Sequence, residues 1–421
     1  MNTPKIRFKG FKDDWEQRKL GDVLICLQNN TFSRADLSNE TGVAKNVHYG
    51  DVLVKFGEVL DVSKEQLPMI SDERVLIKYK ASFLQNGDVI VADTAEDSTV
   101  GKCSEIAGLN NEIVLSGLHT IPYRPKEKFA SGYLGYYLNS DSYHNQLIPL
   151  MQGIKVTSIS KSALRNTDII YPESKEEQAK IGNYFQSLDN LITLHQRKCD
   201  ETKQLKKFML QKMFPKNGEK NPEIRFEGFT DDWEQRKLID YLDVSNEKNK
   251  KGDYKKTDVL SVSGEVGIVN QIEFQGRSFA GVSVENYGIV NEGDVVYTKS
   301  PLKANPYGII KTNKGKAGIV STLYAVYKPK ENTDSNFVQI YFELDSRMNS
   351  YMHPLVNKGA KNDMKVSDEN ALKGNVTFPK INEQKAISNF ITELDNLITL
   401  HQRKCEKLKE LKKFMLQNMF V

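Results

Sequence analysis

Apolar positions recur at alternating spacings of four and three along two segments of the chain, 181–202 and 387–408. The repeating positions are Ile181, Phe185, Leu188, Ile192, His195, Cys199 and Thr202 in the first segment, and Ile387, Ile391, Leu394, Ile398, His401, Cys405 and Leu408 in the second. This spacing is typical of the seam of a coiled coil. Pro172 and Pro379 precede the segments and Pro215 follows the first. The pattern therefore predicts two helices of about 40 residues, each roughly 60 Å long.

The seam of each predicted helix is interrupted towards its C-terminal end. A continued repeat would place Lys206 and Lys412 against the partner helix. Because lysine is rarely buried, we expect the seam to slip until Leu411 and Met415 occupy the inward positions of the second helix. We expect the two helices to pair with each other in an antiparallel arrangement, as a stiff rod.

The remaining regions combine strand-like and helix-like patterns. Residues 87–93, 293–299 and 318–329 resemble strands, whereas 129–147 and 335–352 resemble amphipathic helices. The predicted fold class is α/β, with two mixed α/β domains separated by two long helices that pair as an antiparallel coiled coil, and with an internal pseudo-twofold repeat. The predicted boundaries are 1–172 for the first domain, 173–216 for the first helix, 217–379 for the second domain and 380–421 for the second helix.

Two blocks of the sequence occur twice. Residues 188–214 and 394–420 are identical at 22 of 27 positions, and residues 6–20 and 224–238 at 13 of 15, whereas the regions between them share only short landmarks. Plain recent duplication is one explanation, but it would leave the middle regions equally similar. We prefer the interpretation that the repeated blocks offer two equivalent surfaces to two copies of one partner. The candidate docking residues are Trp15, Arg18, Asp189, Gln196, Arg197, Trp233, Arg236, Asp395, Gln402 and Arg403.

Composition narrows the class of protein without identifying it. Hydrophobic residues make up 39% of the chain and charged residues 27%, which is ordinary for a globular protein. No apolar run is long enough for a membrane span, and the N-terminus has no signal-peptide pattern, so we expect no membrane association. The four cysteines are widely separated, which favours a reducing cytoplasm. The net charge of +4 is a mild indication of an anionic partner.

The order of these motifs resembles that of a known protein family. Pro172 is followed by Glu177-Gln178 and Ile181, and the pattern recurs after Pro379. Together with the doubled Phe-x-Gly-Phe-x-Asp-Asp-Trp-Glu-Gln-Arg-Lys-Leu block, this arrangement resembles the specificity (S) subunit of type I restriction-modification systems over essentially the whole chain. The resemblance implies a DNA-binding subunit that is not itself catalytic and holds no cofactor. Each variable domain would be a target recognition domain for one half of a bipartite, asymmetric site.

The resemblance also implies the partners. The paired helices would set the spacing of the half-sites on double-stranded DNA. Two methyltransferase subunits, which carry S-adenosylmethionine, would dock on the helical and N-terminal repeated blocks, and restriction subunits with translocase activity would join that core.

Candidate DNA contacts follow from the side chains that bind phosphates and base edges. The stretch 295–330 contains no Asp or Glu, and its candidates are Lys299, Lys303, Asn305, Tyr307, Lys311, Asn313, Lys314 and Lys316. The first domain has no equivalent stretch, and its candidates lie in two segments rich in amides and hydroxyls: Asn29, Asn30, Ser33, Arg34, Gln152, Lys155, Ser158 and Lys161. Gly153 aligns with Gly359, so Lys358 and Lys361 join the set.

Catalytic and metal chemistry is weakly supported. Asn305-Pro306-Tyr307 is a shortened form of an adenine methyltransferase signature, and no phosphate-binding loop occurs. His195 with Cys199 and His401 with Cys405 are each one helical turn apart, and pairing could assemble a zinc set, but we expect ordinary seam layers and no metal. The alternative function is a non-enzymatic helical scaffold or regulator that binds proteins or RNA through its two globular heads.

Overall fold

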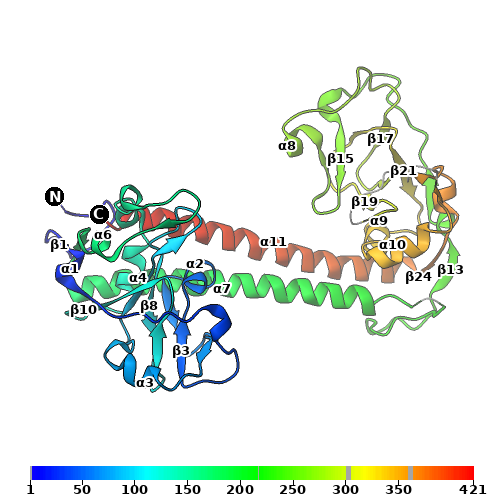
Figure 1. The fold of residues 1–421 in the computed structure, drawn as a ribbon. Helices are drawn as coiled ribbons and strands as arrows, with labels where there is room; N and C mark the ends of the chain where they lie inside the picture. Colours follow the sequence, from blue (N-terminus) through cyan, green and yellow to red (C-terminus); the bar gives the residue numbers. More distant parts are fainter. Residues whose placement is uncertain (1, 217, 300–304, 359–363) are drawn as a thin grey trace. The chain divides into compact units, whose positions relative to one another are not determined.

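The structure is a computed structural model that describes residues 2–216, 218–299, 305–358 and 364–421 (Figure 1). It divides into two compact units: unit 1 comprises residues 1–196 and 403–421, and unit 2 comprises residues 197–402. Two long helices, α7 (Lys175–Lys212) and α11 (Ile381–Asn418), are each shared between the units. Each unit therefore contains part of both helices and one mixed α/β domain. Both helices fall within the ranges that the sequence predicts.

In each unit, the segments of α7 and α11 lie side by side and run in opposite directions (Figure 1). In unit 1, Lys412 Nζ lies 2.7 Å from Asp189 Oδ1, and the Cys405 thiol lies 4.0 Å from the Ile192 carbonyl. In unit 2, Lys206 Nζ lies 2.7 Å from an oxygen of Asp395. Residue numbers rise along one helix as they fall along the other, so the prediction of an antiparallel pair is confirmed.

The predicted seam is the inward face of both helices. Its positions are buried or partly buried throughout, and the most deeply buried are Ile181, Phe185, Leu188, Cys199, Ile387, Ile391, Leu394 and Cys405. The expected slip of the seam is wrong, because Lys206 and Lys412 stay on the inward face and Leu411 is exposed. The reason is electrostatic, because each lysine lies between two carboxylates that compensate its charge. Among the described residues, no helix is long and apolar enough to cross a membrane.

The repeated Glu-Gln pair attaches the start of each long helix to its own unit. Glu177 is buried and accepts two hydrogen bonds from the guanidinium of Arg7, at 2.6 and 2.8 Å. Glu383 accepts the same pair of bonds from Arg225, at 2.7 and 2.8 Å. Each forked ion pair joins an N-terminal repeated block to the start of a long helix more than 150 residues away.

The glutamines of the same motif bind backbone groups. Gln178 donates to the Pro172 carbonyl at 2.7 Å and accepts from the Ala130 amide at 3.0 Å. Gln384 donates to the Pro379 carbonyl at 2.9 Å and accepts from the Asp334 amide at 2.9 Å. Both side chains are fully buried, so this motif serves the internal structure of each unit.

The main sheet of unit 1 has five strands in the order β2-β10-β6-β8-β4. Their bounds are β2 (Leu24–Cys26), β10 (Thr120–Pro125), β6 (Val89–Ala92), β8 (Cys103–Ala107) and β4 (Val59–Asp61). All neighbours are antiparallel except β4 and β8. A second sheet has the order β5-β3-β9, and two strand pairs, β1-β12 and β11-β7, complete the set. Their bounds are β5 (Met69–Ile70), β3 (Ala44–Val47), β9 (Val114–Ser116), β1 (Glu16–Lys19), β12 (Asp168–Tyr171), β11 (Thr157–Ser158) and β7 (Thr94–Ala95).

The main sheet of unit 2 repeats this plan with four strands in the order β14-β21-β18-β19. Their bounds are β14 (Leu242–Val244), β21 (Tyr324–Pro329), β18 (Val295–Thr298) and β19 (Ile310–Thr312). The central pairs share their register, because Val89 lies opposite Tyr123 in unit 1 and Val295 lies opposite Tyr327 in unit 2. The diverged domains therefore have equivalent sheets, and the strands predicted at 87–93 and 293–299 are confirmed. The stretch 318–329 is instead divided into two strands, β20 (Gly318–Val320) and β21, which belong to different sheets.

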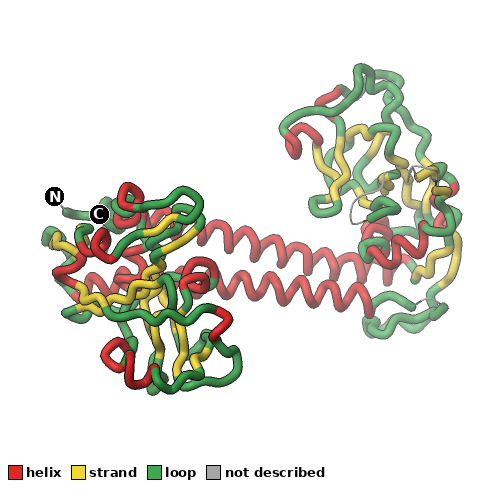
Figure 2. Tube along the Cα trace, in the orientation of Figure 1, coloured by secondary structure: helices red, strands yellow, loops and turns green. Residues whose placement is uncertain are grey.

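The remaining elements of unit 2 are short (Figure 2). The strand pairs are β13 (Glu234–Lys237) with β24 (Asn375–Phe378), β15 (Leu260–Ser263) with β16 (Gly267–Asn270), β17 (Gly288–Val290) with β20 (Gly318–Val320), and β22 (Asn357–Lys358) with β23 (Met364–Lys365). Unit 1 contains the short helices α1 (Leu20–Val23), α2 (Tyr49–Val54), α3 (Val75–Lys78) and α6 (Lys161–Arg165), and unit 2 contains α8 (Gln271–Gln275).

Each predicted amphipathic helix is in fact two short helices. Residues 129–147 form α4 (Tyr133–Leu138) and α5 (Asp141–His144), and residues 335–352 form α9 (Ser335–Tyr341) and α10 (Asp345–Met352). In unit 1 the break occurs at Ser140, whose hydroxyl donates to the Tyr137 carbonyl at 2.6 Å and whose side chain caps the start of α5. A residue that caps a new helix has extended backbone angles, which end the preceding one.

The C-terminal end of each long helix inserts an aromatic side chain into a core. Phe420, which follows α11, stacks on Phe185 at 5.7 Å in unit 1. Phe214, which follows α7, packs against Trp233 and Phe337 at 6.0 and 5.6 Å in unit 2. These aromatic anchors explain part of the identity of the repeated blocks without any external partner.

One buried carboxyl group makes stability depend on pH. Glu105, on β8, is buried and accepts hydrogen bonds from the amides of Gly132 and Gly135 at 2.6 and 3.0 Å. Burial raises the pKa of Glu105 to about 7. The folded chain therefore retains a proton that the unfolded chain has already released, so the contribution of Glu105 to the free energy of unfolding falls as pH rises from about 4.5 to about 7.

We predict that this fall amounts to roughly 3 kcal/mol between pH 4.5 and pH 8. Glu105→Gln, which cannot ionise, should show a smaller loss of thermal midpoint over the same range, and Glu73→Gln, an exposed control, should follow the wild type. Parallel pH profiles for Glu105→Gln and the wild type would contradict the prediction.

Candidate DNA-recognition and partner-docking surfaces

The two candidate DNA-binding segments of unit 1 meet in the structure. Lys161 Nζ donates to Asn29 Oδ1 at 3.3 Å, which links segments more than 130 residues apart. Residues 152–158 form a hairpin closed by two backbone hydrogen bonds between Gln152 and Ser158, at 2.9 and 2.8 Å. At its tip, Gly153 has a left-handed φ of 117° and Ile154 is fully exposed. The hairpin therefore projects Lys155 and an apolar neighbour into solvent.

Some of the candidates in unit 1 serve the loop itself. Asn30 is fully buried, donates to Asn46 Oδ1 at 2.7 Å and accepts from the Phe32 amide at 3.2 Å. It is therefore a structural residue and is not available to bases in this conformation. Arg34 is exposed and pairs with Asp51 at 2.6 Å, and Ser33 caps the turn that follows it.

The stretch 295–330 of unit 2 contains no acidic residue, but acidic side chains from other parts of the chain lie next to its lysines. Lys299 Nζ lies 2.9 Å from Asp368, and Lys330 Nζ lies 3.2 Å from Asp243. Lys328, in the same stretch, pairs with Glu247. Three lysines of this stretch therefore have acidic partners that lie far away in the sequence.

The other candidates in this stretch divide by burial. Asn313 is buried and shapes the turn between β19 and β20 by donating to the carbonyls of Asn291 and Lys316, both at 3.1 Å. Tyr307 is also buried, so both residues are structural rather than surface groups. Burial lowers the pKa of Lys311, which faces the charged groups of Glu343 and Lys206.

The remaining candidates of unit 2 are Lys303, Asn305, Lys358 and Lys361. Asn305 lines a groove together with Lys311 and Glu343. Lys358 lies in β22, and Lys303 and Lys361 lie outside the described residues.

Lys314 and Lys316 are the two candidates of this stretch that are exposed in the β19–β20 turn, and they form no ion pair within the described part of the chain. We predict that changing both to alanine flattens the salt dependence of DNA binding, with the slope of log K against log salt falling by about 2. Changing Lys328 and Lys330 instead, which already have acidic partners, should alter the slope less. An equal effect of the two double variants would contradict the assignment.

The tryptophans of the repeated N-terminal block are core residues. Trp15 and Trp233 are almost fully buried, and the Trp233 indole donates to Glu383 Oε1 at 3.3 Å. The prediction that they contact a partner is therefore not supported by their position. Arg18 and Arg236 are exposed on β1 and β13, each beside a glutamate of its own strand.

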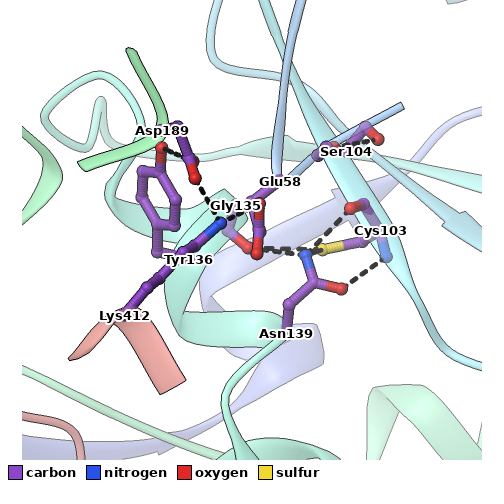
Figure 3. Close-up of polar contacts among 9 residues, drawn as sticks. Glu58, Cys103, Ser104, Gly135, Tyr136, Asn139, Asp189 and Lys412 are labelled. Atoms are coloured by element: carbon purple, nitrogen blue, oxygen red, sulfur yellow. Dashed lines mark hydrogen bonds and ion pairs between the residues drawn. The ribbon is translucent and has the colours of Figure 1, made fainter. Parts of the chain in front are cut away.

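Two lysines on the inward faces, one buried and one partly buried, tie the long helices to the domains, and Figure 3 shows the partly buried one, Lys412. Lys412 on α11 lies 2.8 Å from Glu58 Oε2 and 2.7 Å from Asp189 Oδ1 on α7. The Tyr136 hydroxyl also donates to Asp189, at 2.7 Å. The predicted docking residue Asp189 is therefore engaged within unit 1, on the wall of a groove.

The second lysine repeats the arrangement in unit 2. Lys206 lies 2.5 Å from Glu343 Oε1 and 2.7 Å from Asp395 Oδ1. Burial lowers the pKa of Lys206, but the two carboxylates outweigh it and the net direction is upward. Paired carboxylates thus allow a lysine to occupy a seam position, which hydropathy alone did not predict.

The remaining predicted docking residues are exposed on the helices. Gln196, Arg197, Gln402 and Arg403 all face solvent, and Arg197 lies 3.5 Å from Glu201 one turn away. They are accessible to a partner, and their role stays a prediction.

A stripe of exposed apolar residues beside the seam escaped the sequence analysis. Its members are Leu191, Leu205 and Phe208 on α7, and Leu397, Leu400, Leu411 and Phe414 on α11, each between 40% and 52% exposed. Leu191, Leu205 and Phe208 occupy the same places in their repeated block as Leu397, Leu411 and Phe414 in the other, whereas Leu400 corresponds to the partly buried Leu194. The sequence does contain the signal for this stripe. Large apolar residues recur in both blocks at positions outside the coiled-coil seam, where pairing of the helices does not require them.

The stripe lies on one flank of each helix. If the buried Lys206 is a heptad position a, Leu205 is position g and Phe208 is position c, and these two positions are neighbours on the helix surface. The same positions are occupied by Leu411 and Phe414 relative to Lys412. Because the helices are antiparallel, equal offsets from the seam place the two flanks of a unit on the same face of its helix pair.

Two apolar patches result, one in each unit. Patch 1 consists of Leu191, Leu411 and Phe414 in unit 1. Patch 2 consists of Leu205, Phe208, Leu397 and Leu400 in unit 2.

Comparison with known proteins decides the class. Residues 12–204 and 230–410 match the family described as type I restriction modification DNA specificity domain, once for each half of the chain. The chain belongs to this family. Its members are non-catalytic DNA-recognition subunits, so the resemblance predicted from the repeated motifs is confirmed and the alternative of a protein- or RNA-binding scaffold is not favoured.

Individual relatives agree with the family over the full length. The putative type I restriction enzyme MjaX specificity subunit of Methanocaldococcus jannaschii is 24% identical over 98% of this chain and 94% of its own. The crystal structure of the type I restriction-modification S subunit from M. genitalium shares the fold, with a TM-score of 0.57, 12% identity and coverage of 100% of this chain and 99% of that one. The predicted fold class, two mixed α/β domains with paired long helices, is thereby confirmed.

The specificity subunit has no cluster of three or more side chains suited to a metal among its described residues. The cysteines of the seam each face a backbone carbonyl of the opposite helix: Cys199 faces Ile398 and Cys405 faces Ile192, both at 4.0 Å.

Proposed function

We propose that each α/β domain of this chain recognises one half of a bipartite, asymmetric DNA sequence, and that the paired helices fix the spacing of the two halves. The main support is that the two central sheets share strand order and register while their surrounding loops differ in length and side chains. A common scaffold with different loops suits two readers of different sequences. The half-sites should therefore differ from each other.

We further propose that two methyltransferase subunits dock on this chain, one on patch 1 and one on patch 2. Three positions of patch 2 carry the same residue types as the equivalent positions of patch 1, which suits two copies of the same protein. Exposed leucine and phenylalanine side chains are the kind that become buried at stable interfaces. Restriction subunits would join this core, and we expect the assembly to act in the cytoplasm, which suits four free cysteines.

The test is methylation of a duplex library with two randomised half-sites by the chain reconstituted with its methyltransferase subunit. We expect two short specified blocks separated by an unspecified spacer of fixed length. Methylation without a fixed spacer, or no selection at either half-site, would contradict the proposal. Deleting two whole heptads at equivalent places in α7 and α11 should shorten the spacer while the specified bases stay the same.

A further inference from the structure

The main sheets of the two units have an equivalent corner, formed by the residue after one central strand and the residue before its neighbour. The side chains at this corner differ between the units. In unit 1, the amide of Asp93, directly after β6, donates to the carbonyl of His119, directly before β10, at 3.1 Å. In unit 2, the amide of Lys299, directly after β18, donates to the carbonyl of Leu323, just before β21, at 3.0 Å. Because the strands share order and register, these two pairs occupy the same corner of the two sheets.

The side chains at this corner of unit 1 are an acid and an imidazole. Asp93 accepts a hydrogen bond from the Thr94 hydroxyl at 2.8 Å, and His119 Nδ1 lies 3.4 Å from both the Thr94 hydroxyl and an Asp93 oxygen. About half of the His119 side chain is exposed. Bases that approach here meet a carboxylate acceptor beside a group that can donate or accept.

His119 has an unusual backbone conformation and is packed against an aromatic ring. It has a φ of 54°, and it is the one non-glycine residue with positive φ among the described residues. The Tyr49 ring packs edge-on against it at 5.2 Å. A left-handed conformation at a histidine is uncommon, and such residues gather at functional sites.

The same corner adjoins the exposed hairpin of unit 1. The Asp93 carbonyl accepts from the Ile159 amide at 2.9 Å, directly after that hairpin. The Asn29 side chain donates to the Gly117 carbonyl at 3.2 Å, two residues before His119. The corner therefore joins both segments that sequence reasoning assigned to DNA.

The corner of unit 2 carries a cation and an apolar group. Lys299 pairs with Asp368 at 2.9 Å, and Leu323 is 62% exposed. Asp368 follows β23, the second strand of the hairpin equivalent to that of unit 1. The corner therefore has the same place in both sheets, but aspartate and histidine in unit 1 are replaced by lysine and leucine in unit 2.

We propose that these corner positions discriminate bases in the two half-sites, with Asp93 and His119 acting in the first and Lys299 and Leu323 in the second. This inference rests on the proposed function. A carboxylate accepts from the amino groups of cytosine or adenine, lysine donates to guanine O6 and N7, and a leucine side chain contacts the methyl group of thymine. The two corners therefore favour different base pairs.

The test uses the reconstituted complex with its methyltransferase subunit and a duplex library randomised at both half-sites. Asp93→Asn and His119→Ala should each relax preference about tenfold at one base pair of the first half-site and leave the second unchanged. Leu323→Ala should relax the second half-site alone. Asp72→Asn, which changes a partly exposed acid elsewhere in unit 1, should leave both preferences as in the wild type.

The unmutated domain is the internal control for folding and assembly. Wild-type preference in both half-sites for all three variants would overturn the inference, and so would loss of preference in both half-sites at once. Failure of the wild-type complex to select any bipartite site would instead overturn the proposed function itself.

Discussion

Replacing Arg225 by alanine is expected to lower the free energy of unfolding of the specificity subunit by about 3–5 kcal/mol. The change leaves the carboxylate of Glu383 buried without its cation, since that side chain is only 3% exposed. The Trp233 indole, at 3.3 Å, remains as a weak donor and cannot balance the charge. Urea unfolding at neutral pH measures the loss, and Arg7→Ala should give a similar result because Glu177 is equally buried.

Matched substitutions separate this ion pair from general loss of charge. Arg236→Ala removes an exposed arginine from the same repeated block and should change stability by about 0.5 kcal/mol or less. Arg225→Lys keeps a cation but loses the forked geometry, so it should lie between alanine and the wild type. An alanine variant as stable as the Arg236→Ala control would show that Glu383 is not held by Arg225.

The Arg225 and Glu383 pair also shows where sequence reasoning stops. Both residues stand in repeated motifs that were recognised as a family signature, but nothing in the local pattern indicates that one motif binds the other across 158 residues. Periodicity finds a helix and its inward face because both are local properties. The partner of a charged group depends on tertiary packing, which the sequence gives only through the family.

The same limit explains the errors in the candidate sites. The stretch 295–330 lacks acids in sequence, but Asp368 and Asp243 approach it in space. The expected slip of the seam at Lys206 assumed that a lysine avoids burial, and two carboxylates at hydrogen-bond distance remove that objection. In contrast, the link between Asn29 and Lys161 agrees with the assignment of both residues to one surface.

Identity between the repeated blocks has two separate causes in this structure. Inward residues such as Lys206, Gln384 and Phe420 are explained by contacts within the units. Those contacts do not explain Leu205 and Phe208, which are exposed and still repeated as Leu411 and Phe414. A surface that is repeated but not used internally is the strongest indication of a repeated partner.

Changing Leu205 and Phe208 together to glutamate is therefore expected to remove one of two bound methyltransferase subunits. Loss of a buried aromatic anchor from an interface typically costs about 2 kcal/mol or more, so affinity at that patch should fall at least about 30-fold. Leu411→Glu with Phe414→Glu should remove the other copy, and all four changes should remove both. Native mass spectrometry or sedimentation of the reconstituted complex gives the number of subunits bound.

The control has the same change of net charge on the opposite flank of the helix. Lys207→Glu also changes the charge by two units, and heptad position b faces away from positions g and c. It should leave two subunits bound, and thermal unfolding of the free chain should be similar for all variants because every altered side chain is exposed. If Leu205→Glu with Phe208→Glu still binds two subunits with wild-type affinity, the partner docks elsewhere, and the repetition of these apolar side chains would need another explanation.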